Sequence, residues 1–334
     1  MVNIHYFQRK RREGQNFSLE QIFEGVRDQL KNKYQVSKIE VPYVSSGILK
    51  RLANVIYCVS KQGTINHVTG DINYVNLLLS KKRNVLTILD CGILHRVNGF
   101  KRKVIEKIWF KIPVKRSSTV TVISEATKQD LINVTGCNPE KIRVIYVPIS
   151  TKFKPVPQNF NKVKPRILQI GAAPNKNLTR LIEAVVDIDC TLSIIGKISD
   201  INLRKLEENK VDYENFVGLP FNRVIEEYVK CDLLFFASTF EGFGMPILEA
   251  QATARPVLTS NILSMPEVGG NAACYVDPYN TKDIKTSILK IVNDDEYRQT
   301  LIQNGLKNIK RFDSSHIARQ YAKVYDKIIE NLSQ

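Results

Sequence analysis

The sequence predicts an α/β protein built from two doubly wound domains, each a parallel sheet covered by helices. Short apolar runs alternate with helix-length amphipathic segments through most of the 334 residues. The alternation stops at 150–165, STKFKPVPQNFNKVKP, which has three prolines and no apolar periodicity, and then starts again. The chain is also long enough for two domains with complete hydrophobic cores.

The proline-containing segment sets the expected domain boundary. Residues 1–155 are predicted to form the first domain and 156–314 the second, with a C-terminal helix at about 315–334 that packs back on the first domain. Strands are expected at 3–7, 39–44, 65–68, 84–89, 119–123, 141–147, 166–170, 191–195, 215–217, 233–237, 256–259 and 272–276. Helices are expected at 18–33, after Ser124, at 177–186 and through the last 50 residues.

Composition is that of an ordinary globular protein, with 43% hydrophobic and 25% charged residues. No apolar run reaches about 18 residues, so no transmembrane helix is expected. The basic N-terminus lacks the apolar segment of a secretory signal. The six cysteines include no CxxC pair, so we expect reduced thiols in a cytoplasmic protein without disulfides or zinc.

Positive charge is concentrated in one half of the chain. Residues 1–155 hold 27 Lys and Arg against 11 Asp and Glu, whereas 156–334 hold 22 of each. This excess predicts an anionic partner: a membrane surface, a phosphorylated lipid or a nucleic acid. The sequence has no helix-turn-helix, zinc-finger or aromatic RNP pattern, so a nucleic acid is not the expected partner.

The segment 238–250, STFEGFGMPILEA, is the strongest chemical signal. It follows an apolar run, LLFFA, and opens a predicted helix. Gly242 and Gly244 permit a tight turn, and Pro246 suits a first helical turn. The amino end of such a helix offers N–H groups and partial positive charge to a phosphate. From these residues alone, a glycine-rich turn with surface glutamates is an equally good interpretation.

Two carboxylates flank this turn. Glu249 lies on the helix, where it can accept two hydrogen bonds from a ribose diol, and Glu241 lies just before the turn. If one helix held both, they would be about 12 Å apart along its axis. This separation exceeds that of glycosidase carboxylate pairs, so it weakens a hydrolase interpretation.

Several motifs together resemble the retaining GT-B glycosyltransferases of glycosyltransferase family 4. They are EGFGMPILEA with its E-x7-E spacing, RPVLTS, MPEVGGNAACYVDP, QIGAAPNKNLTRLIEA, FVGLPFNRVIEEYVKCDLLFFAST and TVTVISEATKQDL. The resemblance implies a GT-B fold, two Rossmann-like domains facing across a cleft. It also implies a retaining, metal-independent hexosyltransferase that needs no cofactor and uses a UDP-sugar or GDP-sugar donor.

The resemblance also assigns roles to residues. It makes Glu241 and Lys176 the catalytic pair, with Lys176 on the donor pyrophosphate, Glu241 near the sugar hydroxyls and Glu249 on the ribose. The other implied donor-binding residues are Gly14, Gly171, Gly218, Leu219, Gly242, Phe243, Gly244 and Met245. Asp90 is implied on the acceptor side. A solvated lysine at 176 and a plain loop glycine at 14 are the alternatives.

Two departures from the family pattern leave a second function open. Ala172 stands where family members usually have an arginine, and Leu89 stands where they usually have a histidine. These changes suggest a non-catalytic GT-B relative that binds nucleotide or glycan and supports a partner transferase. His67 and His95 are interpreted as structural residues, not as replacements for that histidine.

Two further segments have competing interpretations. Asp187 and Asp189 have the spacing of a metal-binding DxD motif, but aspartates between a helix and a strand commonly form turns, so no metal site is predicted. A helix at 101–112 would place lysines on one side and apolar residues, including the only tryptophan, on another. That helix suits a membrane interface or a core-facing position with a solvated basic side.

Together these observations predict an enzyme of bacterial surface polysaccharide synthesis. It would move a sugar from a nucleotide sugar to a glycan or a polyprenyl-diphosphate-linked acceptor. The basic N-terminal half would hold it, as a peripheral protein, on the anionic inner face of the cytoplasmic membrane. No protein nucleophile is expected, because the departing diphosphate can take the acceptor's proton.

Overall fold

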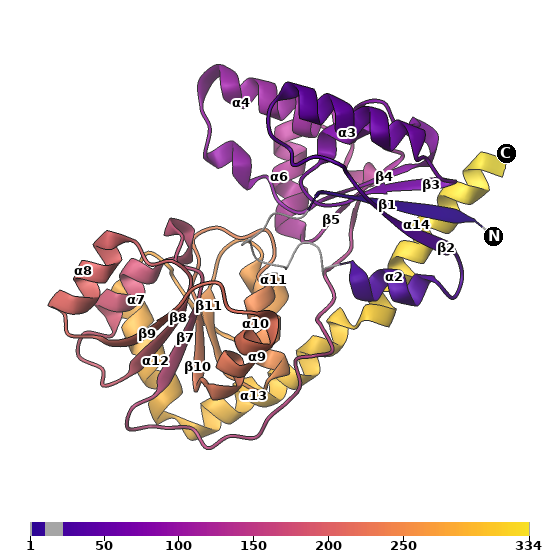
Figure 1. The fold of residues 1–334 in the computed structure, drawn as a ribbon. Helices are drawn as coiled ribbons and strands as arrows, with labels where there is room; N and C mark the ends of the chain where they lie inside the picture. Colours follow the sequence, from indigo (N-terminus) through magenta and orange to yellow (C-terminus); the bar gives the residue numbers. More distant parts are fainter. Residues whose placement is uncertain (1, 11–22, 334) are drawn as a thin grey trace. The chain divides into compact units, whose positions relative to one another are not determined.

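The computed structural model describes residues 2–10 and 23–333 and divides the chain into two units. Unit 1 consists of 1–148 and 313–334, and unit 2 of 149–312 (Figure 1). The division falls after Pro148 and not after residue 155, because the segment between them bonds to unit 2. The N–H of Ile149 donates to the carbonyl of Phe312 at 2.9 Å, and the ring of Phe153 packs edge-on against that of Tyr228 at 5.5 Å.

Unit 1 is built on a six-stranded parallel sheet with the order β2-β1-β3-β4-β5-β6. Its strands are β1 (Asn3–Gln8), β2 (Gln35–Glu40), β3 (Ile65–Val68), β4 (Asn84–Ile88), β5 (Thr119–Val122) and β6 (Ile142–Val144). The expected strand at 39–44 is wrong in position. β2 is an edge strand that leaves polar residues exposed, so it shows no apolar run.

Helices cover both faces of this sheet, as Figure 1 shows. They are α2 (Glu24–Leu30), α3 (Ile48–Ser60), α4 (Gly99–Ile105), the π-helix η4 (Glu106–Lys111), α5 (Ile112–Lys115), α6 (Glu125–Thr135) and α14 (Ser314–Ser333). Ser124 caps α6 as predicted, its Oγ accepting from the N–H of Thr127 at 3.0 Å. The helix expected at 101–112 continues past Pro113. The proline cannot donate to the carbonyl of Trp109, four residues earlier, and Nδ2 of Asn73 donates to that carbonyl at 3.1 Å instead.

The last helix, α14, belongs to unit 1. Tyr321 and Tyr325 are buried among Tyr6, Phe23 and other core residues. The hydroxyl groups of Tyr325 and Tyr6 share a hydrogen bond of 2.5 Å. Helix α14 therefore completes the core on one face of the first sheet, although it is separated from the rest of unit 1 by the whole of unit 2 in the sequence.

Unit 2 has a second six-stranded parallel sheet, with the order β12-β11-β10-β7-β8-β9. Its strands are β7 (Arg166–Ile170), β8 (Thr191–Ile195), β9 (Asp212–Phe216), β10 (Leu233–Phe236), β11 (Val257–Ser260) and β12 (Cys274–Val276). The strand order reverses at β7 and β10, where adjacent carboxyl ends open toward ligands in folds of this kind.

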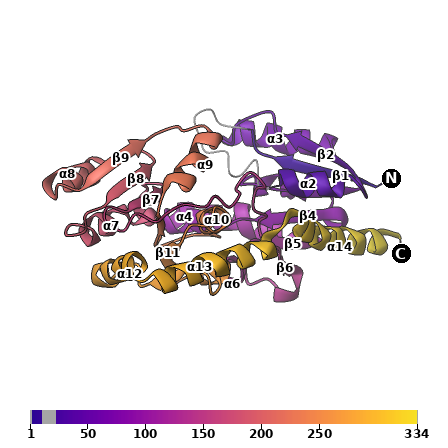
Figure 2. The ribbon, with the colours of Figure 1, turned by 90° about the horizontal axis from the view of Figure 1, so that it is seen from below.

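The helices of unit 2 are α7 (Leu178–Ala184), α8 (Asp200–Glu208), α9 (Phe221–Lys230), α10 (Met245–Ala252), α11 (Met265–Gly269), α12 (Thr281–Asn293) and α13 (Asp295–Asn308). Figure 2 shows them from a second direction, with α12 and α13 following one another. Both units are doubly wound parallel sheets, which confirms the predicted α/β class. Within the described residues, no helix combines the length and the apolar composition needed to span a bilayer.

Candidate functional site

Lys176 and Glu241 meet at the carboxyl ends of β7 and β10, which are neighbours in the second sheet. The ammonium nitrogen of Lys176 lies 2.6 Å from Oε1 of Glu241. Both side chains are mostly shielded from solvent, with 21% and 15% of their areas exposed. The same ammonium lies 4.7 Å from the ring centroid of Phe236, an arrangement that further favours the cation.

Gly171 makes room for the Lys176 side chain. Its φ is +86°, and a Cβ at this position would lie 3.0 Å from Cγ of Lys176. The amide nitrogen of Gln169 donates to the carbonyl oxygens of Gly171 at 2.9 Å and Lys176 at 3.0 Å. The buried side chain of Gln169 therefore fixes the backbone of this loop, and the aliphatic part of the Lys176 side chain packs against Gly171.

Two asparagines, which no motif in the sequence marks, join the loop after β7 to the loop after β10. Asn175 Nδ2 donates to the carbonyl of Phe240 at 3.0 Å, and the carbonyl of Asn175 accepts from the N–H of Thr239 at 2.8 Å. Asn177 has a φ of +63° and donates from Nδ2 to the carbonyl of Ala237 at 3.0 Å. These bonds set the separation of Lys176 and Glu241.

The glycine-rich turn leads directly into α10, as predicted. Gly244 has a φ of +115°, in the region that favours glycine, and Pro246 lies in the first turn of the helix. The hydroxyl of Ser264 donates to the carbonyls of Glu241 at 3.1 Å and Phe243 at 2.8 Å. The turn is thereby fixed next to a helix amino end, where N–H groups lack intrahelical acceptors.

Glu249, on α10, is held by a partner from α9. The hydroxyl of Tyr228 donates to Oε2 of Glu249 at 2.5 Å. Burial raises the pKa of Glu249 to about 7, although this hydrogen bond and the charge of Lys176 both act to lower it. Glu249 therefore keeps its proton to a higher pH than an ordinary glutamate does, and no motif in the sequence marks its partner Tyr228.

Gly218 and Leu219 follow β9, on the far side of β8 from β7. Gly218 has a φ of +71° and is exposed. Both residues lie at the carboxyl edge of the second sheet, the edge that also carries Lys176 and Glu241. They lie in a loop that follows the carboxyl end of a parallel strand, and ligands of doubly wound sheets bind at such loops.

In unit 1, Asp90 follows β4 at the carboxyl edge of the first sheet, and its side chain is exposed. Its Oδ1 accepts from the N–H of Gly92 at 2.7 Å, which forms a local turn. Burial raises the pKa of the neighbouring Asp130, the charge of His95 lowers it, and Asp90 raises it. Gly14 lies outside the described residues.

The structural interpretation of His67 is confirmed. This buried side chain shares hydrogen bonds of 2.7 Å with the hydroxyl of Tyr325 and with that of Thr87. Burial lowers the pKa of His67 to about 3, so the ring is neutral at physiological pH. It cannot act as a cation near a ligand from this position.

The aspartates at 187 and 189 and the helix expected at 101–112 each had two interpretations. Asp187 pairs with Lys285 at 2.7 Å, and Asp189 lies 4.0 Å from Lys164, so the two carboxylates face different lysines. In the helical stretch that begins at α4, Ile105, Ile108 and Trp109 pack against the core of unit 1. The apolar side of that stretch is therefore core-facing.

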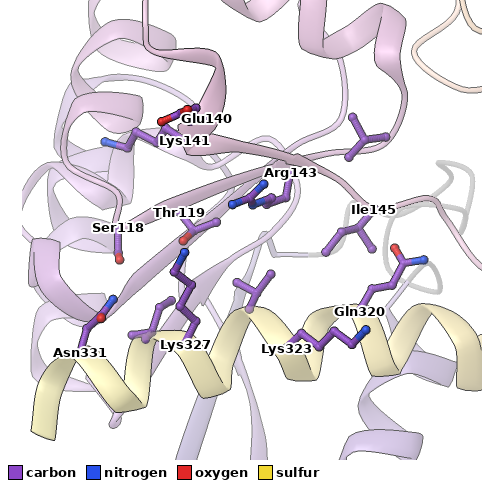
Figure 3. Close-up of a pocket in the computed structure, with 13 residues that line it drawn as sticks. Ser118, Thr119, Glu140, Lys141, Arg143, Ile145, Gln320, Lys323, Lys327 and Asn331 are labelled. Atoms are coloured by element: carbon purple, nitrogen blue, oxygen red, sulfur yellow. The ribbon is translucent and has the colours of Figure 1, made fainter.

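A basic pocket lies elsewhere in unit 1, with a volume of about 470 Å³. Figure 3 shows Lys327 rising from α14 toward Thr119, with Arg143 of β6 above the same helix. Thr119 begins β5, and Lys141 immediately precedes β6. The pocket therefore runs from the amino end of β5 along the edge strand β6 and is covered by α14, away from Asp90.

Residues 150–308 match the family model of glycosyl transferases group 1. An uncharacterized glycosyltransferase of Methanocaldococcus jannaschii is 32% identical over 170 residues, which cover 48% of each chain. The O-antigen chain mannosyltransferase RfbU of Salmonella typhimurium is 28% identical over 227 residues, 63% of this chain and 61% of that protein. The chain thus aligns with less than two thirds of the length of these curated relatives.

The fold likeness extends over nearly the whole chain. The crystal structure of Anabaena HepE in complex with UDP and glucose gives a TM-score of 0.78 at 17% identity, and the match covers 98% of this chain and 100% of that one. This likeness confirms the GT-B fold class predicted from the sequence. The family match and the relatives together support a glycosyltransferase.

Proposed function

We propose that this protein is a retaining, metal-independent glycosyltransferase of the family 4 type. It transfers a hexosyl group from a UDP-sugar or GDP-sugar to a glycan or polyprenyl-diphosphate-linked glycan. The observation that carries this proposal is the Lys176–Glu241 pair beside the amino end of α10. A lysine, a carboxylate and a helix amino end in one place suit a sugar joined to a diphosphate.

The proposed reaction needs stabilisation of negative charge on the departing diphosphate. Lys176 and the first N–H groups of α10 lower the barrier, because they are fixed before that charge develops. When the diphosphate binds, Lys176 exchanges its bond to Glu241 for one to phosphate, and Glu241 becomes available to the sugar hydroxyls. The acceptor attacks the face that the diphosphate leaves, and its proton passes to the leaving phosphate oxygen.

Glu249 would hold the nucleotide in the proposed complex. A carboxylate can accept hydrogen bonds from both hydroxyls of a ribose diol. Tyr228 keeps the carboxylate of Glu249 in place before the donor binds. In this proposal Glu249 binds the nucleotide and Tyr228 positions Glu249, and neither residue takes part in bond breaking.

The acceptor and the cellular site follow from charge and from the relatives. Unit 1 contains 28 basic and 14 acidic residues, against 21 and 19 in unit 2. This excess supports an anionic, lipid-diphosphate acceptor and peripheral attachment to the inner face of the cytoplasmic membrane. The name of the Salmonella relative supports a role in bacterial surface polysaccharide synthesis, and the ligands of the Anabaena structure support a UDP-sugar donor.

The test is a thermal-shift screen of UDP-, GDP- and ADP-sugars, followed by transfer assays with the donor that binds. A donor at one hundred times its dissociation constant should stabilise the fold by about 2.7 kcal/mol. Nuclear magnetic resonance of the product reports whether the anomeric configuration is retained. A protein that binds none of these donors and transfers none of their sugars contradicts the proposal.

A non-catalytic relative is the second candidate, favoured by Leu89 and Ala172 in place of the usual histidine and arginine. Leu89 lies at the carboxyl end of β4 and is partly exposed. This candidate predicts donor binding without turnover. Equal background hydrolysis in the wild type, Lys176→Ala and Glu241→Ala would support it against the enzyme.

A further inference from the structure

Helix α3 has an apolar face that nothing in the described structure covers. Ile48 is 81% exposed, Leu49 82% and Ile56 58%, and Leu52 and Val59 lie on the same side. At about 100° per residue, these five positions fall within an arc of about 100°. Single exposed apolar residues are common on protein surfaces, but five on one helix face mark a binding surface.

The side of α3 next to this face already meets the core of unit 1. Val55 and Cys58 are buried there, and Asn54 donates to the hydroxyl of Tyr74 at 3.0 Å. The exposed apolar face is therefore not needed to attach the helix to its own sheet. The exposed face adjoins the buried one and extends the apolar surface of the helix beyond the residues that reach the core.

The surroundings of this face are basic. Lys50 and Lys61 are exposed at the two ends of α3, and residues 41–70 contain no Asp or Glu. The guanidinium of Arg51 lies 4.7 Å from the ring centroid of Trp109, which joins α3 to the helical stretch beginning at α4. The exposed cations of α4 are Lys101, Arg102 and Lys103.

We propose that α3 docks onto an anionic lipid bilayer, with Ile48, Leu49 and Ile56 inserted among the acyl chains and the flanking cations on the head groups. An exposed apolar stripe on a helix that has a lysine near each end, in a stretch of chain without acidic residues, has the chemistry of an interfacial helix. A second copy of the chain would bring two basic surfaces together, so charge favours a lipid over a dimer. The proposal rests on the membrane attachment in the proposed function and assigns it to α3.

This assignment differs from the helix at 101–112 that the sequence suggested. The apolar residues Ile105, Ile108 and Trp109 face the core of unit 1 and are not available to a bilayer. The exposed residues of α4 instead add positive charge to unit 1. The exposed Phe100, at 82%, is the main apolar contribution of that segment.

The test is co-sedimentation of the full chain with vesicles of phosphatidylglycerol and phosphatidylcholine, compared with phosphatidylcholine alone. Wild-type protein should bind the anionic vesicles, and added salt should weaken that binding. The double variant Leu49→Glu/Ile56→Glu should lose at least about tenfold in partitioning. Ile201→Glu, an equally accessible apolar site on α8 of unit 2, is the matched control and should bind as the wild type does.

Three results would overturn the proposal. One is equal sedimentation of the double variant and the wild type, and another is equal binding of wild type to neutral vesicles. The third is a wild-type dimer that the double variant converts to a monomer without loss of vesicle binding, which would assign the face to a second copy. Thermal shift of the same variants with UDP tests the donor site separately. Vesicle binding without any nucleotide binding would contradict the proposed function but would still support membrane docking by α3.

Discussion

The ammonium of Lys176 and the carboxylate of Glu241 neutralise each other in the protein without ligand. A diphosphate brings negative charge to the same place, so it competes with Glu241 for Lys176. In the proposed reaction, Lys176 supplies a positive charge to the leaving group once its ion pair with Glu241 is broken. A partly shielded pair of this kind is stronger than a fully exposed one, because water screens it less.

Replacing Lys176 by Ala should lower kcat/KM for transfer by about 100- to 1000-fold, the usual effect of removing one preorganised group that stabilises a developing charge. The measurement is the initial rate with the donor identified by thermal shift. Lys285→Ala is the matched control, because Lys285 also pairs with a carboxylate, Asp187, but lies away from the site. An unchanged rate in Lys176→Ala would remove this lysine from the mechanism.

The pKa of Glu249, raised to about 7 by burial, gives donor binding a pH dependence. In the proposed complex, ribose hydroxyls donate to the ionised carboxylate of Glu249, so affinity for UDP should increase as pH rises from 6 to 8. Tyr228→Phe removes a hydrogen bond that lowers this pKa, so it should move the midpoint to higher pH, whereas Glu249→Gln should make the profile flat. Calorimetric titration at each pH measures the effect, and a pH-dependent Glu249→Gln would contradict it.

The same shift affects stability with a definite sign. Because the pKa of Glu249 in the folded state is above its unfolded value of about 4.3, the native state binds the extra proton. The protein should lose stability as pH rises through this window, and Glu249→Gln should remove that loss. Urea unfolding at pH 5 and pH 8 tests this. The free energy of unfolding of Glu249→Gln should increase relative to that of the wild type only at the higher pH.

Residue-level sequence reasoning identified Lys176, Glu241 and Glu249 because each lies within a motif. It missed Tyr228, since no spacing rule connects this residue on α9 with a glutamate on α10. It also missed Asn175 and Asn177, whose importance depends on loops that only the folded sheet brings together.

At the scale of elements, apolar runs predicted the buried strands well and the edge of the sheet poorly. β4 has five buried residues in succession and was expected within one residue of its end. β2 has mixed exposure because it borders the sheet, so the strand predicted at 39–44 began four residues too late. The π-helix η4 was not expected. It differs from an α-helix in its backbone hydrogen bonds before Pro113, and this difference does not change the spacing of the apolar residues.

Helix α14 should contribute strongly to the stability of unit 1, because Tyr325 binds both Tyr6 and His67 in the buried core. Tyr325→Ala should destabilise the protein by about 3–5 kcal/mol, the usual cost of removing a buried aromatic side chain. Chemical denaturation measures this. Leu332→Ala changes an exposed apolar residue of the same helix, and it should have a much smaller effect. Similar losses in both variants would argue against this anchoring role.

At the scale of the whole molecule, the alternation of apolar runs and helical segments was sufficient for the fold class. It was not sufficient for the exact boundary. The prolines of 150–165 suggested a linker, yet Phe153 packs on Tyr228, and the carbonyl of Val156 accepts from Arg255 at 2.9 Å. Residues of this segment are therefore part of unit 2, and only their tertiary partners show it.

Unit 2 should fold and bind nucleotide without unit 1. It is a continuous stretch, 149–312, with its own sheet and core, and its two ends are joined by the hydrogen bond from Ile149 to Phe312. It contains Lys176, Glu241, Glu249 and Tyr228, whereas Asp90 and the basic surface belong to unit 1. A fragment of 149–312 should unfold cooperatively and be stabilised by UDP, with no transfer activity and no affinity for anionic vesicles. A folded fragment that fails to bind the UDP bound by the full chain would show that unit 1 supplies essential donor contacts.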